Sequence, residues 1–115
     1  MTLLTENRPW GSYTILDESP VHKTKRIEVL PGQRLSYQSH QKRDELWLII
    51  EGDAVVTLND VEHQLSYGKK IEIKAGEKHR VENRSDKIMK FIEIQTGTYF
   101  GEDDIVRYQD DYARV

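Results

Sequence analysis

The chain has 115 residues, with 17 basic and 20 acidic side chains and a formal net charge of -3. This length fits one domain, and so balanced a charge predicts neither a nucleic-acid surface nor a surface for anionic membranes. The sequence contains no cysteine, which excludes disulfides, thiolate metal sites and cysteine nucleophiles, so any metal must take nitrogen and oxygen ligands.

The N-terminal segment, residues 1–22, contains one predicted strand at 13–17. It lacks a basic stretch followed by an apolar run, and no part of the chain approaches the roughly 20 apolar residues of a membrane-spanning helix. Together with the absence of cysteine, this predicts a cytoplasmic protein without a membrane segment.

The remaining predicted strands are short apolar or alternating runs, each closed by Gly, Asn or Asp. They lie at residues 25–30, 46–52, 54–60, 69–76, 79–83 and 90–97. So many strands in so short a chain predict an all-β sandwich or barrel, and among these a jelly roll closes its edges within this length.

Residues 102–112 form the one segment with a weak helical pattern, in which Ile105, Val106 and Tyr108 would face a core. We therefore expect a single domain over residues 1–115. It would consist of an N-terminal arm at 1–22, a barrel core at about 23–96 and an irregular or helical C-terminal segment at 97–115. A barrel of this size buries more apolar surface as a homodimer, which is the expected assembly.

Four side chains of the predicted strands could bind one metal ion. Gln38 and His40 are two residues apart, so they point to the same face of an extended strand. Glu45 follows the polar turn after His40 and returns on the next strand, and His79 enters from another strand. One amide, two imidazoles and one carboxylate suit a divalent metal, with zinc, iron, manganese, cobalt and nickel all open.

Two stretches around these residues resemble the paired motifs of the cupin family. The first is PGQRLSYQSHQKRDELWLIIEG, with Gln38 in the place of the first histidine, and the second is YGKKIEIKAGEKHRVEN, with His79. Together with RPWGSY and EIQTGTYFGEDDIVRYQDDYARV, they resemble the C-terminal cupin domain of type II mannose-6-phosphate isomerases. Gln41, Lys42 and Leu46 depart from this pattern, because histidines are usual at these positions.

The resemblance implies a cupin double-stranded β-helix, a jelly-roll barrel, that interconverts mannose 6-phosphate and fructose 6-phosphate with one divalent metal, zinc being the expected ion. The guanylyltransferase domain of bifunctional members is absent from the sequence, so guanylyl transfer is not expected. Glu93 shares a predicted strand face with Phe91 and Gln95 and is the candidate base. Lys25, from its strand face, and Arg107, in the C-terminal signature, are candidates for binding the phosphate, and Arg107 is also a candidate catalytic residue.

Three other functions remain open for this sequence. A cupin of this kind could bind a sugar or sugar phosphate without catalysis, because fold alone does not fix function. A metal-dependent dioxygenase would need open coordination positions, which an amide ligand makes less attractive. A metal-free epimerase would use a His/Tyr pair, and the clustered ligands argue against it.

Overall fold

The computed structural model describes residues 3–112, in which eleven strands and one 3₁₀ turn form two antiparallel sheets. The strands in chain order are β1 (Leu4–Arg8), β2 (Gly11–Glu18), β3 (His22–Val29), β4 (Tyr37–His40), β5 (Arg43–Glu51), β6 (Ala54–Leu58), β7 (Val61–Leu65), β8 (Lys70–Ile73), β9 (His79–Glu82), β10 (Met89–Gly97) and β11 (Ile105–Gln109). Within residues 3–112, no helix has the length and apolar character needed to cross a membrane.

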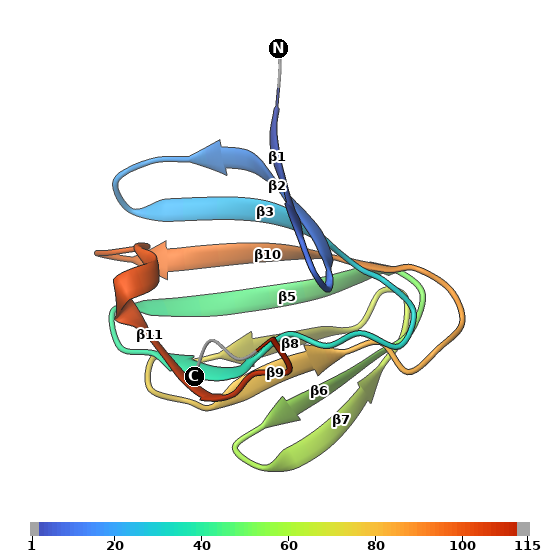
Figure 1. Cartoon of the computed structure of the whole chain (residues 1–115). Helices are drawn as coiled ribbons and strands as arrows, with labels where there is room; N and C mark the ends of the chain where they lie inside the picture. Colours follow the sequence, from blue (N-terminus) through green and yellow to red (C-terminus); the bar gives the residue numbers. More distant parts are fainter. Residues whose placement is uncertain (1–2, 113–115) are drawn as a thin grey trace.

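The two sheets pack face to face, as the all-β sandwich prediction requires (Figure 1). The larger sheet has the order β1-β2-β3-β10-β5-β8, and the smaller one has the order β11-β4-β9-β6-β7. Alternate side chains of the central strands point between the sheets, and the fully buried ones include Val29, Ile49, Val56, Val81 and Phe91. One side of this interior is apolar, and the other contains the polar cluster described below.

Two edge strands, β1 and β7, were not predicted from the sequence. Strand β7 has four exposed residues and one half-buried residue, so its sequence lacks the apolar alternation of a half-buried strand. It forms because Asn59 and Asp60 both take positive φ, 48° and 69°, which closes a tight hairpin with β6. Turn geometry therefore determines this strand more than side-chain burial does.

The C-terminal segment joins the smaller sheet. A 3₁₀ turn at Glu102–Asp104 leads into β11, which pairs antiparallel with β4 so that Arg107 lies opposite Gln38. The helical alternative for residues 105–109 is therefore wrong, because pairing with the otherwise open edge of β4 satisfies their backbone groups. This pairing brings the C-terminal segment beside the predicted ligands.

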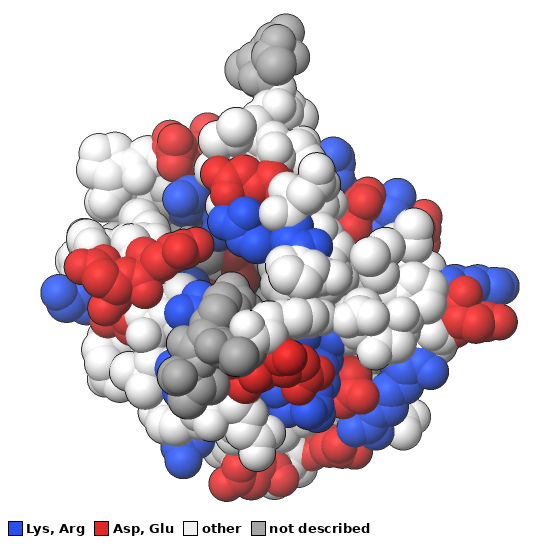
Figure 2. Space-filling view, viewed as in Figure 1, with Lys and Arg blue, Asp and Glu red and all other residues white. Residues whose placement is uncertain are grey.

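The charged surface is mixed in sign. Figure 2 shows acidic and basic side chains interspersed among the described residues of one face, so this face has no continuous basic track. Surface charges also form ion pairs with one another, such as Arg34 with Asp111 and Arg84 with Glu62.

Asn83, at the end of the second motif, ties three segments together. Its side chain is completely buried, and its amide nitrogen donates to the carbonyl oxygens of Val29 at 2.9 Å and Lys87 at 2.6 Å. Its amide oxygen accepts a hydrogen bond from the Ser85 backbone at 3.0 Å. These contacts give Asn83 a structural role.

We expect Asn83→Ala to lower the free energy of unfolding by about 3 kcal/mol, because the buried Val29 carbonyl oxygen loses the Asn83 donor and the Lys87 carbonyl oxygen keeps only the Ser85 hydroxyl. Urea denaturation measures this loss. The neighbouring Arg84→Ala removes only ion pairs at the protein surface and should change the free energy of unfolding much less. Equal effects of the two substitutions would contradict the structural role of Asn83.

Candidate metal centre

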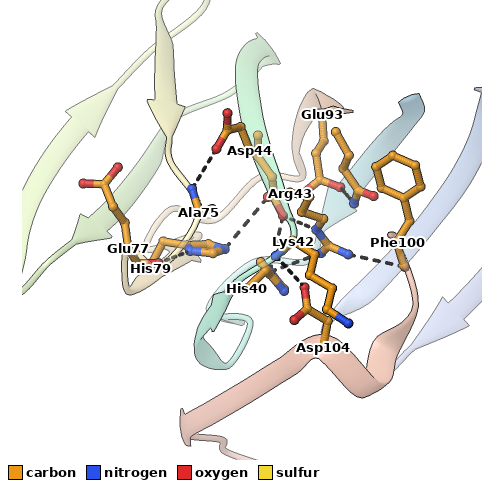
Figure 3. A network of polar contacts seen from close by, with 12 residues as sticks. His40, Lys42, Arg43, Asp44, Ala75, Glu77, His79, Glu93, Phe100 and Asp104 are labelled. Atoms are coloured by element: carbon orange, nitrogen blue, oxygen red, sulfur yellow. Dashed lines mark hydrogen bonds and ion pairs between the residues drawn. The ribbon is translucent and has the colours of Figure 1, made fainter. Parts of the chain in front are cut away.

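The β4–β5 hairpin sets the positions of His40 and Glu45. The Asp104 carboxylate accepts hydrogen bonds from the backbone nitrogens of Gln41 and Lys42, at 3.3 and 3.0 Å, and so fixes the turn between the strands (Figure 3). His79 is the first residue of β9, directly opposite Gln38 of β4. The two segments that carry the sequence motifs therefore meet at one place between the sheets.

The side chains of His40, Glu45 and His79 form a compact buried cluster (Figure 3). His40 Nε2 lies 3.3 Å from Glu45 Oε2, and His79 Nε2 lies 3.9 Å from Glu45 Oε1. One ligand atom from each residue lies within 4.8 Å of the other two, and each residue is less than 5% exposed. A single ion placed among these atoms could contact all three.

The histidines have the protonation that metal binding requires. His79 Nδ1 contacts the Glu77 carbonyl oxygen at 3.0 Å and must carry a proton to donate to it, which leaves the Nε2 lone pair facing the cluster. Burial is the main cause that lowers the pKa of His79 and lowers that of His40 to about 3, with Arg43 adding to the shift of His40. Both rings are neutral near pH 7, so this donor set fits a divalent metal.

Gln38, the fourth predicted ligand, lies beside the three clustered residues. Its side chain lines the same cavity as His40, Glu45 and His79, and its backbone pairs with His79 on one side and Arg107 on the other. It is half-buried, whereas the other three side chains are buried. Its role as a ligand stays a prediction.

A second carboxylate, Glu93, lies next to Glu45. The Trp47 Nε1 hydrogen is shared between Glu45 Oε1 at 2.9 Å and Glu93 Oε2 at 3.1 Å, and Gln95 donates to Glu93 Oε1 at 2.6 Å. Burial raises the pKa of Glu93 to about 7, and the nearby Glu45 charge adds to the shift. Such a carboxyl group can accept or release a proton near neutral pH.

Cations also line this cavity. Lys25 is opposite Glu93 in the pairing of β3 with β10, its Nζ lies 4.4 Å from the centre of the Tyr13 ring, and burial lowers its pKa. Arg107 lines the same cavity, and its buried Nε has no hydrogen-bond partner among the described residues. Arg8 contributes a further guanidinium from the end of β1. The cavity thus combines a ligand cluster with several positive charges.

The family model described as "Mannose-6-phosphate isomerase C-terminal" matches residues 2–110. The chain belongs to this family.

The family's relatives include much longer proteins. Xanthan biosynthesis protein XanB of Xanthomonas campestris pv. campestris (strain B100) is 42% identical over 108 residues, which cover 94% of this chain and 23% of that protein. The mannose-1-phosphate guanylyltransferase of Escherichia coli (strain K12) is 40% identical, with 94% and 23% covered. The chain therefore spans less than a quarter of the length of these relatives.

Solved structures confirm the cupin fold. The capsular polysaccharide assembling protein CapF of Staphylococcus aureus superposes with a TM-score of 0.85 at 22% identity, covering 95% of this chain and 33% of that one. KdgF from Halomonas sp. gives a TM-score of 0.78 at 14% identity, with 90% of each chain covered. A sugar phosphate isomerase from the cupin superfamily, from Silicibacter pomeroyi, gives 0.70 at 21% identity, with 87% and 76% covered.

The positions that depart from the family pattern lie outside the ligand cluster. Leu46 pairs with Ile94 and alternates with the inward-facing Glu45 and Trp47, so it points to the outer face of the larger sheet. Gln41 and Lys42 form the exposed β4–β5 turn.

Sequence reasoning missed two arginines of the cavity, Arg43 and Arg8. Arg43 is only 8% exposed and contacts both His40 and Glu45, whereas its sequence context predicts a residue of the polar turn between His40 and Glu45. Strand alternation extended backwards from Trp47 through Glu45 would have placed Arg43 on the inner face. Arg8 belongs to the RPWGSY motif, but no periodic pattern around it predicts that its side chain lines the cavity.

Proposed function

We propose that this domain is a metal-dependent isomerase that interconverts mannose 6-phosphate and fructose 6-phosphate. The observation that carries the proposal is the buried cluster of His40, Glu45 and His79 beside Glu93, whose pKa is raised to about 7. A metal centre and a carboxyl group that titrates near neutral pH are the two parts that this reaction needs. Family membership supports the same assignment.

His40, Glu45 and His79 would hold the ion, with Gln38 as a fourth ligand. Zinc is the expected metal, and iron, manganese, cobalt and nickel fit the same donors. When bound, the metal would act as a Lewis acid that stabilises negative charge on the sugar oxygens.

Glu93 would move the proton. Isomerisation transfers one proton between C1 and C2 of the sugar while a second moves between the two oxygens, so no outside reagent is consumed. The Glu93 carboxylate would take the proton from one carbon and return it to the other. Its hydrogen bonds to Trp47 and Gln95 would keep the carboxyl group oriented during both steps.

Arg107 and Lys25 would bind the phosphate group. Arg107 lines the cavity with its Nε free of partners among the described residues, and a guanidinium can hold two phosphate oxygens at once. Lys25 would add charge from the opposite sheet, since β3 and β11 belong to different sheets. A substrate held in this way would span the cavity from the cations to the ligand cluster.

A homodimer is the expected assembly. The outer face of the larger sheet carries apolar side chains on its central strands, among them Leu48 and Ile94, which are 39% and 37% exposed. A second copy that packs on this face would cover them. Sedimentation velocity would measure the assembly, and a monomer at micromolar concentration would contradict the proposal.

Isomerase assays before and after chelation test the proposed function. We expect turnover of mannose 6-phosphate by metal-loaded protein, loss of turnover after removal of the metal, and recovery when zinc is added. Unphosphorylated mannose should react far more slowly, because it lacks the group that Arg107 and Lys25 would bind. Binding of sugar phosphates without turnover would favour a non-catalytic binding module instead.

A further inference from the structure

The guanidinium group of Arg43 lies inside the proposed ligand cluster (Figure 3). Its Nε donates to Glu45 Oε2 at 2.9 Å, and its Nη2 contacts His40 Nε2 at 3.1 Å. These two acceptor atoms are 3.3 Å apart. Arg43 therefore uses the same lone pairs that a metal ion would use.

Arg43 also sets the tautomer of His40. A guanidinium can only donate hydrogen bonds, so His40 Nε2 must be the acceptor and the ring proton must sit on Nδ1. His40 Nδ1 is buried and has no hydrogen-bond partner among the described residues, so the contact with Arg43 is what orients the ring. The tautomer that Arg43 selects is the one that binds a metal through Nε2.

The positive charge of Arg43 compensates the buried carboxylate of Glu45. An unpaired carboxylate with 4% exposure would be strongly disfavoured, and Arg43 pairs with it directly. A divalent ion at the same atoms would supply the same compensation. The two cations would also repel each other at such short range, so they cannot share this position.

We propose that Arg43 is a built-in competitor of the metal, which keeps the ligands oriented when no ion is bound and must move away when one binds. This inference rests on the metal centre of the proposed function. Arg43 is then a positioning residue. It lowers the metal affinity of the cluster, and it keeps the Glu45 and His40 side chains in place when no metal is bound.

The structure provides a place for the displaced guanidinium. Arg43 Nη1 already lies 3.4 Å from the Phe100 carbonyl oxygen, on the side away from His79 (Figure 3). The backbone of Arg43 is tightly packed, since an added side-chain carbon at Gly97 would lie only 2.9 Å from Arg43 Cα. The change would therefore be confined to the side chain, which would release Glu45 and His40 and turn toward Phe100.

Zinc titration of Arg43→Met tests the proposal. A chromophoric chelator that competes for zinc measures the dissociation constant, which should fall about tenfold relative to the wild type, a typical size for coupling between two binding events. Without zinc, the variant should melt at a lower temperature than the wild type, and zinc should raise its melting temperature more. Arg26→Met removes one positive charge from β3 at a position facing away from the cluster and should leave zinc affinity unchanged.

Arg43→Lys provides a second test if the methionine variant does not fold. Lysine keeps the positive charge but lacks the planar guanidinium that contacts Glu45 and His40 together. Zinc affinity should therefore rise by a smaller factor, about threefold. Equal or weaker zinc binding by the Arg43 variants would overturn the competitor role. If neither the wild type nor any variant binds zinc or another divalent metal, the metal centre of the proposed function fails instead.

Discussion

Replacing His79 with alanine should remove metal binding and isomerase activity together. His79 is one of the three buried ligand residues that cluster within residues 3–112, and its Nε2 is fixed toward Glu45 by the hydrogen bond of Nδ1 to Glu77. We expect metal affinity to fall by more than about 100-fold, because changes outside the ligand shell alone cost about 10–100-fold. Elemental analysis after dialysis and the isomerase assay measure the two losses.

The controls for His79→Ala must separate ligation from packing. The His79 ring lies 5.6 Å from the Trp47 ring, so alanine also leaves a space in the interior. His79→Leu fills much of that space without a ligand atom, and it should lose metal to the same extent. His63→Ala, on the exposed strand β7, should leave both properties unchanged. Retained metal and activity in both His79 variants would contradict the metal mechanism.

Strand alternation made the inner faces of the sheets predictable from the sequence. Phe91, Glu93 and Gln95 were expected on one face of a strand, and all three are buried in the structure. The same period brought Gln38 and His40 to one cavity. The alternation of side chains along a strand depends only on the local sequence. The inward-facing residues could therefore be predicted without knowing which strands pair with one another.

Features that depend on pairing or on long-range contacts could not be predicted in this way. Strand β11 forms because it pairs with the open edge of β4. The sequence of residues 105–109 alone does not show that this edge is available. The burial of Arg43 could not be predicted for a different reason. A charged residue beside a polar turn is usually exposed, and the burial of Arg43 depends on its contacts with Glu45 and His40.

Replacing Glu93 with glutamine should remove activity while metal binding is retained. The substitution keeps the size of the side chain but removes the group that would accept the proton, so kcat should fall by about 10²–10⁴-fold, the usual contribution of a general base. Single-turnover or steady-state assays measure the loss, and zinc titration measures the retained affinity. Loss of activity with normal zinc binding separates the proton-transfer role of Glu93 from the ligand role of Glu45.

The environment of Glu93 can accept this amide if the Gln95 amide turns, which exchanges one buried group without a partner, Gln95 Oε1, for another, Gln95 Nε2. Gln95 Oε1 is buried and has no hydrogen-bond partner among the described residues, so the Gln95 amide can turn and accept a hydrogen bond from the introduced NH₂ group. The introduced carbonyl oxygen can still accept from Trp47 Nε1. The fold should therefore stay intact, and full activity in a folded Glu93→Gln variant would mean that another group moves the proton. Lys25 would then be the residue to replace, because it is opposite Glu93 in the strand pairing and burial lowers its pKa.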